Sequence, residues 1–320
     1  MHTYIYIYCD SFVFRSFNNE KPELVNMSSA ELAAKVVKNL GSEDYKLLKV
    51  LASGLKQHAS LTKDEIVTYS KMHEDIVNFR ISRLNEMKLI GKNQMGYSLL
   101  MMGLDAIALK MLADNGIIIG MGKPIGIGKE SDVFEAITYT KERRALKFFR
   151  IGRISFREAR RKRTFAASQN IHHWLLVNIG AAKKECDVLD QLRHIKIRTP
   201  IIYYRAMHCV IMNRIDDGLR LIDIKKLNDP KETLQSILYD IGVAYKHNII
   251  NCDLSEYNVL LDSRNNIWII DWPQAVSRRH PNAADLIRRD VYNIVRFFNR
   301  RFNLTKNIDE ALREVITAPT

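Results

Sequence analysis

Three polar residues within 251–274 have the types and the spacing that phosphoryl transfer requires. Asp253 is followed by Asn258 five residues later and by Asp271 thirteen residues after that. An aspartate in such a site accepts a hydroxyl proton or orients the nucleophile. Mg²⁺ prefers oxygen ligands and needs few protein groups when phosphates complete its shell, so Asn258 and Asp271 suffice as a metal pair. Singly, the three residues also suit a turn and two strand caps; their combination indicates catalysis.

The residues between Asn258 and Asp271 explain how these two side chains meet. Apolar runs at 259–261 and 267–270 include β-branched residues, and a polar segment joins them. This pattern predicts a hairpin of two strands. Pairing of the strands would place Asn258 at the entry of one beside Asp271 at the exit of the other. We therefore expect both oxygen ligands to converge on one point.

The composition is that of a globular protein with a strong positive charge. The 320 residues are enough for two or three domains, and 47% of them are hydrophobic while 27% are charged. The net charge of +13 favours a polyanionic partner such as nucleic acid, a ribonucleoprotein or an anionic membrane surface. Four scattered cysteines without a CxxC pair favour neither a zinc site nor a disulfide framework, and indicate a reducing, cytoplasmic compartment. No apolar run approaches the roughly 18 residues of a membrane span, so we expect no membrane partner.

The first 26 residues carry the weakest pattern. They lack the basic leader and apolar core of a secretory signal. The alternation of Tyr4, Tyr6 and Tyr8 suits a strand, whereas a cap-like Ser28 and a helical pattern come next. We interpret 1–26 as either an extension from an upstream start codon or a disordered lead.

A first domain is predicted at 27–115. Its periodicity indicates three helices, at 42–57, 62–70 and 73–90. Ser42 and Thr62 are the expected caps, and Val77, Ile81 and Leu84 are expected to face inward. The third helix ends in two short strands around a polar turn, which is a winged-helix pattern, and a linking helix then ends at Gly116.

The winged helix has an unusual charge for a DNA reader. The third helix of such a domain normally enters the major groove. Here it begins with Glu74 and Asp75, which suit a helix N-terminus but repel phosphates. We therefore expect a structural role or docking to a ribonucleoprotein rather than sequence-specific DNA binding, with RNA, DNA and protein all kept as candidate partners.

A second domain is predicted at 116–320 and begins with a glycine-containing loop. Gly126 and Gly128 lie between two strand patterns, close to Lys129 and Ser131. Glycines let backbone amides approach phosphate oxygens. The loop alone equally suits a plain hairpin turn, because Ser131 stands where a GxGxxG motif has its last glycine.

The strand after this loop strengthens the prediction of a phosphate site. Lys147 shares a face with Ala145 and Phe149. A lysine on the inner face of a strand needs an anionic partner. Lys147 is placed as a phosphate-binding lysine of a kinase would be. In the next helix, at 175–192, Glu185 lies beside the packed face and would be the partner of Lys147; the alternative is an exposed glutamate.

Two further segments surround the predicted site. The strand and bend at 208–219 suit a hinge that binds adenine through its backbone, and we assign Met212, Asn213 and Ile215 to it. The arginine-rich segment 150–174 contains several aromatic residues; it fits a solvated mobile loop, but also RNA or phosphate contact.

Together these residues resemble the RIO family of atypical protein kinases, and its second subfamily, which carries an N-terminal winged helix. The resemblance rests on GIGKESDVF, ALKFFRIGRISFR, CDLSEYNVLL and IIDWPQ, and covers about 28–315. It implies an α+β fold in which a winged helix precedes a two-lobed kinase domain, with lobes at about 116–212 and 213–320. It also implies an ATP- and Mg²⁺-dependent serine/threonine kinase or ATPase in small ribosomal subunit maturation. The partners would be the small-subunit precursor or its rRNA, Mn²⁺ would be a substitute metal, and the protein would be a monomer.

The resemblance assigns a role to each site residue. Asp253 would be catalytic, Asn258 and Asp271 the Mg²⁺ ligands, Lys147 the phosphate-binding lysine and Glu185 its partner, Lys129 and Ser131 phosphate neighbours, and Asp290 a brace for the catalytic loop. Asp271 would also accept phosphate in an ATPase cycle that proceeds through an aspartyl phosphate.

The chain departs from the family pattern at three positions. Asn251 and Cys252 replace the usual histidine and glycine, and Asn213 replaces the hinge glutamate. There is no APE-type segment or activation loop, so a standard peptide groove is not expected, and the lack of a long C-terminal tail favours an archaeal-like member. One alternative is a small-molecule phosphotransferase of the aminoglycoside-kinase kind, which would not explain the winged helix. A DNA-binding regulator with an idle kinase fold is the other.

Overall fold

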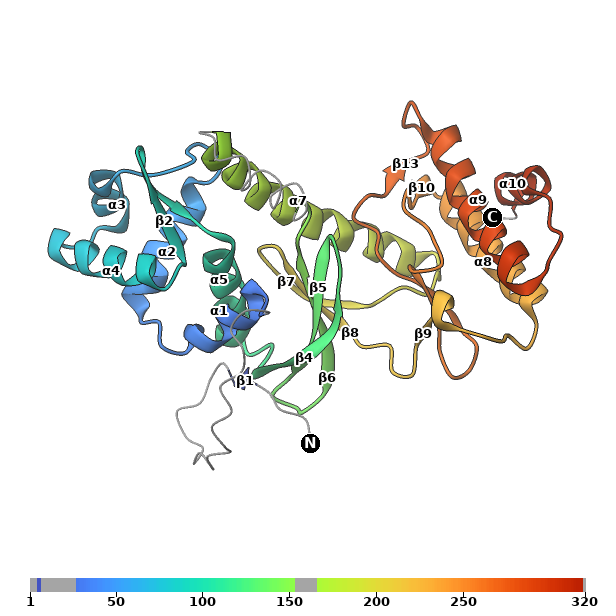
Figure 1. The fold of residues 1–320 in the computed structure, drawn as a ribbon, viewed down its shortest axis with the longest axis horizontal. Coiled ribbons are helices and arrows are strands. Elements are labelled where there is room, and N and C mark those ends of the chain that lie inside the picture. Colours follow the sequence, from blue (N-terminus) through green and yellow to red (C-terminus); the bar gives the residue numbers. More distant parts are fainter. Residues whose placement is uncertain (1–4, 7–26, 153–165, 319–320) are drawn as a thin grey trace. The chain divides into compact units, whose positions relative to one another are not determined.

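The computed structural model describes residues 5–6, 27–152 and 166–318, with side chains at 27–152 and 173–318. The chain forms two compact units (Figure 1). The first unit comprises Met1–Ala182 and Tyr203–Met212, and the second comprises Lys183–Ile202 and Asn213–Thr320.

The first unit begins with the predicted winged helix. Its elements are α1 (Ser29–Val37), α2 (Ser42–Gly54), α3 (Lys63–Ser70), α4 (Glu74–Glu86), β2 (Ile90–Asn93), β3 (Gly96–Leu99) and α5 (Met101–Asp114). Thr62 caps α3 through the expected capping box with Glu65. The N-cap of α2 is Gly41, however, and Ser42 is its first helical residue, because Asp44 accepts the Gly41 N–H. Three helices and a hairpin confirm the predicted order.

The apolar stripe of α4 is buried as its spacing predicts. Val77, Ile81 and Leu84 all lie in the core, where α4 packs against α2 and α3. The same core continues through α5 to side chains of the neighbouring sheet, among them Phe134 and Phe148. The winged helix and the sheet of the first unit therefore share one apolar core.

A six-stranded sheet follows. Its strands are β1 (Ile5–Tyr6), β4 (Gly120–Ile127), β5 (Ser131–Ile137), β6 (Arg143–Phe149), β7 (Ile202–Ala206) and β8 (Cys209–Asn213), in the spatial order β1-β4-β5-β6-β8-β7. Ile5 and Tyr6 pair antiparallel with Met121 and Gly120, so part of the strand suggested by the tyrosine alternation exists. Its other residues, like most of 1–26, lie outside the described part.

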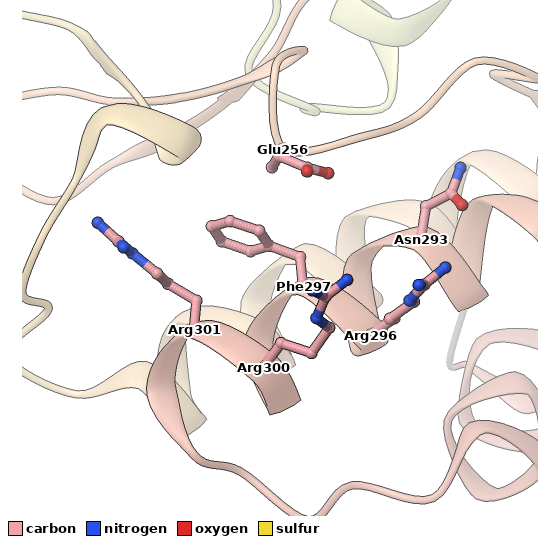
Figure 2. A pocket seen from close by; sticks show the side chains of 6 residues that line it. All are labelled: Glu256, Asn293, Arg296, Phe297, Arg300 and Arg301. Atoms are coloured by element: carbon pink, nitrogen blue, oxygen red, sulfur yellow. The ribbon is translucent and has the colours of Figure 1, made fainter.

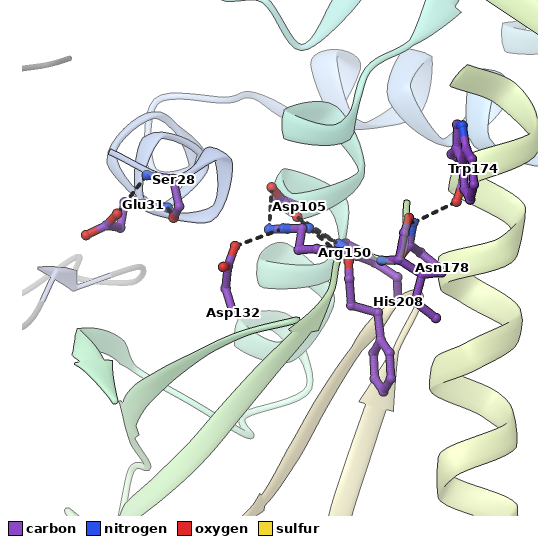
Figure 3. Close-up of polar contacts among 10 residues, drawn as sticks. Ser28, Glu31, Asp105, Asp132, Arg150, Trp174, Asn178 and His208 are labelled. Atoms are coloured by element: carbon purple, nitrogen blue, oxygen red, sulfur yellow. Dashed lines mark hydrogen bonds and ion pairs between the residues drawn. The ribbon is translucent and has the colours of Figure 1, made fainter. Parts of the chain in front are cut away.

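A buried ionic network joins α5 to this sheet (Figure 3). The Arg150 guanidinium donates to both carboxylate oxygens of Asp105 on α5, at 2.9 and 3.0 Å, and to Asp132 on β5 at 3.0 Å. His208 lies 2.7 Å from the Asp105 carboxylate. Arg150 is 4% exposed and the other three are fully buried. Buried charges persist where they are paired and hydrogen-bonded, so this network fixes the winged helix on the sheet.

The second unit is mainly helical. Its helices are α8 (Pro230–Lys246), α9 (Ala283–Phe302) and α10 (Ile308–Thr317), with a short 3₁₀ helix at Leu221–Asp223. Its strands are β9 (Leu219–Arg220), β10 (Ile249–Ile250), β11 (Val259–Leu261), β12 (Ile267–Ile269) and β13 (Val276–Ser277). β11 pairs with β12 and β9, and β10 pairs with β13. The long helix α7 (Ala166–His194) contains the predicted segment 175–192. None of the described helices is long and apolar enough to span a membrane.

Candidate active site

The predicted hairpin brings Asn258 and Asp271 to the same end. β11 and β12 are antiparallel, with Val259 opposite Ile269. Beyond that pair, the Ile270 N–H donates to the Asn258 carbonyl at 2.9 Å. Asn258 accepts the hydrogen bond that closes the hairpin, and Asp271 follows the residue that donates it. The two residues therefore lie at the same end of the hairpin, as the sequence predicts.

The turn of this hairpin is held by Asp262. Its carboxylate accepts hydrogen bonds from the Asn266 side chain at 2.9 Å and the Trp268 indole at 3.1 Å. Burial acts to raise the pKa of Asp262, but these and two backbone hydrogen bonds outweigh it and hold the pKa at about 2. The Asp262 carboxylate therefore stays ionised at neutral pH and keeps its hydrogen bonds across the turn, which fixes the register of the two strands.

The side chain of Asn258 is oriented by the catalytic loop. Its Nδ2 donates to the Asp253 carbonyl at 2.8 Å. Because the amide nitrogen is engaged in this way, the Oδ1 atom is the group that Asn258 can offer to a metal ion. Asp253 itself is exposed.

Asn251 joins the two candidate catalytic aspartates. Its Oδ1 accepts the Asp253 N–H at 3.0 Å and its Nδ2 donates to the Asp271 carbonyl at 3.1 Å. Asn251 is only 5% exposed. From the sequence, Asn251 could be recognised only as a replacement for the family histidine, and its two hydrogen bonds could not be predicted. An amide carries both a donor and an acceptor, so it can link the loop to the hairpin end.

Side chains of the α9 helix hold the loop around Asp253, the predicted catalytic loop, through hydrogen bonds. The Asp290 carboxylate accepts the N–H groups of Cys252 at 2.8 Å and Leu254 at 3.2 Å, so its expected bracing role is confirmed. Arg289 donates to the Cys252 carbonyl, and Asn293 donates to the Leu254 carbonyl at 3.1 Å. Burial raises the pKa of Asp290 to about 6, against the hydrogen bonds from the loop and the charge of Arg289.

Two residues of the site have a left-handed backbone although neither is glycine. The φ angles are 69° at Cys252 and 66° at Asp271. This conformation costs most L-residues, such as Cys252, roughly 1–2 kcal/mol, whereas aspartate adopts it more readily. Such strain persists where the surroundings impose it, commonly at functional sites. Here the Asn251 and Asp290 hydrogen bonds impose it on the loop.

Glu185 is buried and contacts the segment after Asp271. It is 1% exposed, which makes the alternative of an exposed glutamate wrong. Its Oε1 accepts the Trp272 N–H at 3.0 Å, a contact that the sequence did not indicate. The predicted pair with Lys147 stays a prediction.

Asn213, the predicted hinge residue, is engaged within its own unit. Its Oδ1 accepts the Ile201 N–H at 2.5 Å, and its own N–H donates to the Ile201 carbonyl at 2.9 Å. In place of the family glutamate, Asn213 thus ties the hinge to the residue before β7. Met212 is buried, and the half-buried Ile215 has a backbone N–H without a partner among the described residues.

The first unit presents the glycine loop and Lys147. Gly126 lies opposite Val133 on β5, and Val133 lies opposite Lys147 on β6, so the three residues form one row across the sheet. The Gly128 N–H donates to the Ser131 carbonyl at 2.8 Å, which closes the turn that carries the exposed Lys129. Lys147 is 6% exposed, as an inward lysine should be.

The space above Gly126 suits a ligand. A Cβ atom at Gly126 would meet no protein atom within 4 Å. Packing within the chain therefore does not require glycine there, although glycine inside a strand is unfavourable. Close approach of a phosphate to the backbone gives it a reason. The loop and its row to Lys147 fit a nucleotide phosphate.

The predicted RNA or phosphate contact of segment 150–174 lies mostly outside the described residues. Its described ends are tied to α7: the Ile151 N–H donates to the Asn178 side chain at 2.7 Å, and Asn178 donates to the Trp174 carbonyl (Figure 3).

Comparison with known proteins decides the family. Residues 132–311 match the family described as "RIO domain", and residues 37–115 match the one described as "Rio2, N-terminal". The chain belongs to the RIO family of atypical protein kinases. The two matches together confirm the predicted order of a winged helix followed by a RIO kinase domain.

Relatives of this RIO kinase come from archaea and eukaryotes. The RIO-type serine/threonine-protein kinase Rio2 of Methanocaldococcus jannaschii is 34% identical over 251 residues, which covers 77% of this chain and 92% of that protein. The serine/threonine-protein kinase rio2 of Dictyostelium discoideum is 32% identical over 278 residues, and the match spans about half (53%) of its length. A crystal structure of the Chaetomium thermophilum Rio2 kinase, in an ADP/Mg²⁺-phosphoaspartate complex, matches with a TM-score of 0.78 and 28% identity over 88% of this chain and 89% of that one.

Proposed function

We propose that this RIO kinase uses ATP and Mg²⁺ to act as a serine/threonine kinase or ATPase in maturation of the small ribosomal subunit. The observation that carries the proposal is the linkage of Asp253, Asn258 and Asp271 through the amides of Asn251 and Asn258. This linkage holds one candidate base and two candidate metal ligands in a fixed relation, which positional catalysis of phosphoryl transfer requires.

The donor set suits a hard cation. Asn258 and Asp271 offer amide and carboxylate oxygens, and Mg²⁺ commonly takes few protein ligands besides substrate phosphates. The same oxygens suit Mn²⁺. When bound, the metal ion neutralises charge on the transferred phosphate.

The remaining residues bind and orient. Lys147 and the amides at Gly126, Gly128, Lys129 and Ser131 would bind phosphate oxygens, and the Ile215 N–H would receive adenine at the hinge. Asp253 would align the nucleophile and take its proton.

An ATPase cycle through Asp271 is the favoured form of the activity. The Chaetomium thermophilum relative is described as a phosphoaspartate complex. In this chain Asp271 has a left-handed backbone conformation, and its carbonyl accepts a hydrogen bond from Asn251. An aspartate held at the hairpin end can attack the γ-phosphorus of ATP, with ADP as the leaving group, and water then hydrolyses the acyl phosphate to the carboxylate and inorganic phosphate.

The winged helix favours a partner other than duplex DNA. On α4, Arg80 donates to Glu43 at 2.6 Å and Arg83 donates to Asp44 at 2.8 Å, so both arginines are engaged by α2. The exposed α4 residues include Phe79, which is 62% exposed. With its arginines paired and its N-terminus acidic, α4 lacks the phosphate contacts that position a recognition helix. A cytoplasmic ribosomal precursor fits the net charge of +13.

The test is ATP turnover by the purified chain with Mg²⁺, with and without small-subunit precursor particles. Asp253→Ala and Asp271→Ala should abolish turnover, whereas Asp187→Ala, at an exposed position of α7, should not. With γ-labelled ATP, a hydroxylamine-sensitive label that is absent from Asp271→Ala would support the aspartyl-phosphate cycle. Absence of turnover in the folded wild-type chain under every condition would overturn the catalytic proposal.

A further inference from the structure

A pocket of about 460 Å³ lies in the second unit, beside the catalytic loop (Figure 2). Its lining residues are Glu256, Asn293, Arg296, Phe297, Arg300 and Arg301. Figure 2 shows five of them along one helix, which is α9, and Glu256 facing them from the loop. The volume lies within the roughly 300–1,000 Å³ range of ligand sites and exceeds what one inorganic ion needs.

Helical spacing explains why these side chains meet. Residues 293, 296, 297, 300 and 301 follow the i, i+3, i+4, i+7, i+8 repeat of one helix face. This is not the apolar side of α9, which buries Val291, Ile294 and Phe298. Three of the five positions on the pocket face are exposed arginines, and only Phe297 joins the core.

The three arginines carry uncompensated charge. Among the described residues, Arg296, Arg300 and Arg301 make no ion pair, whereas nearby Arg288 pairs with Asp309 at 2.7 Å. Arg301 donates weakly to the Ile224 carbonyl at 3.4 Å, and Arg296 lies 5.7 Å from the Tyr292 ring centre. Against three guanidinium groups the pocket has one carboxylate, that of Glu256. Its surplus of positive charge selects an anion.

We propose that this arginine pocket binds single-stranded RNA, with backbone phosphates on Arg296 and Arg300 and a base against Phe297 and Glu256. The inference rests on the proposed function, because it names the RNA component of the precursor as the partner. Guanidinium groups bind phosphate in a fork and also stack on bases. The Glu256 carboxylate can accept hydrogen bonds from base amino groups.

The composition of the pocket favours RNA over a phosphorylated peptide. A phosphoserine side chain brings only negative charge, which Glu256 would repel. A nucleotide brings a phosphate together with an apolar ring and amino donors, so it satisfies the arginines, Phe297 and Glu256 at once. The spacing of Arg296 and Arg300, four residues or about 6 Å along the helix axis, also suits successive backbone phosphates.

Occupancy of the pocket bears on the catalytic loop. Asn293 lines the pocket and donates to the Leu254 carbonyl, one residue after Asp253. Glu256 belongs to the same loop, and its carbonyl accepts the Ile222 N–H at 3.1 Å. RNA in the pocket therefore contacts the segment that presents the candidate catalytic aspartate.

Binding of a fluorescently labelled oligocytidylate, whose bases carry an exocyclic amino group, to the full chain, without nucleotide, tests the proposal. The variant is Arg296→Ala with Arg300→Ala. The matched control is Arg279→Ala with Arg313→Ala, which removes two exposed arginines from the same unit. We expect Kd to rise about tenfold or more in the pocket variant, and the slope of log Kd against log salt to fall by about 1.4, since each phosphate contact on a single strand contributes about 0.7. The control should change Kd less than about twofold.

Thermal unfolding of each variant separates loss of the site from loss of the fold. Equal weakening of pocket and control variants would mean that RNA binds by diffuse charge, and would overturn the proposal. So would unchanged oligocytidylate affinity in the pocket variant, whether or not binding of a phosphoserine peptide is weakened. The binding test contains no ATP, so its outcome does not depend on turnover. The RNA proposal can therefore fail while the proposal of catalysis holds, and the proposal of catalysis can fail while RNA binding holds.

Discussion

The side-chain amide of Asn251 lies between Asp253 and Asp271 and hydrogen-bonds to the backbone of both, at 3.0 and 3.1 Å. Asn251 stands where the family has a histidine, and in this chain its side chain connects the two aspartates. An amide supplies one acceptor to Asp253 and one donor to Asp271. The loop that carries Asp253 and the hairpin end that carries Asp271 are therefore joined through one side chain.

Removal of this amide should lower both activity and stability. Asn251→Ala leaves the Asp253 N–H and the Asp271 carbonyl without their partner, which we expect to cost about 1–3 kcal/mol in the free energy of unfolding. Displacement of the two aspartates should lower kcat by about 10²-fold. Asn251→His should retain more activity than Asn251→Asp, because aspartate lacks the donor for Asp271. Equal kcat in the histidine and aspartate variants would contradict this role.

Substitution of Cys252 should reveal the backbone strain of the loop. At a φ of 69°, glycine removes a conformational cost of roughly 1–2 kcal/mol, whereas a β-branched residue raises it. We expect Cys252→Val to unfold more easily than Cys252→Gly in urea, even though valine keeps more apolar surface at this buried position. The reverse order would show that packing of Cys252, rather than its φ angle, dominates.

Asp290 should produce an acidic limit in the pH dependence of turnover. Burial raises its pKa to about 6, with the nearby charge of Asp253 adding to the shift and Arg289 opposing it. Protonation would replace an acceptor oxygen facing the loop N–H groups with a donor, so kcat should fall below about pH 6. Asp290→Asn should lower kcat and remove this limb. Asp240→Asn is the control, because burial raises the pKa of Asp240 to about 6 as well, yet it lies on α8 away from the loop hydrogen bonds.

The same shift has a defined sign for stability. The folded-state pKa of Asp290 lies above its ordinary 3.8, so the folded protein keeps a proton that the unfolded chain releases between pH 3.8 and about 6. The contribution of Asp290 to stability is fully present below pH 3.8 and is lost as the pH rises through about 6. Urea unfolding at several pH values should show a smaller loss in Asp290→Asn than in the wild type, because Asp240, whose pKa burial also raises to about 6, still contributes with the same sign.

The buried network of Arg150 should be among the most sensitive sites of the first unit. Asp105→Ala leaves the guanidinium buried with one carboxylate fewer, which should cost about 3–5 kcal/mol. The comparison is Glu142→Ala, which breaks the surface pair with Arg144 on the same sheet and should cost about 0–1 kcal/mol. Similar unfolding midpoints for the two variants would mean that the network does not fix the winged helix on the sheet.

Local patterns in the sequence determined the elements and the chemistry. The period of Val77, Ile81 and Leu84, the capping box of Thr62, and the two apolar runs before Asp271 depend only on neighbours in the chain, so they could be recognised without a fold. The inward direction of Glu185 followed from helical spacing in the same way. The spacing of Asp253, Asn258 and Asp271 indicated phosphoryl transfer because the hairpin itself is local.

Only the tertiary structure decided which distant residues serve these elements. Asp105 could be noticed as an acid among the apolar residues of its helix, but its partner Arg150 is 45 positions away, and no local period connects them. The same holds for Asn293, which reaches the catalytic loop 39 residues earlier, and for Glu185 at the Trp272 amide. Hydrogen bonds and ion pairs act over a few ångströms in space, whatever the separation in sequence, so the folded chain alone specifies them.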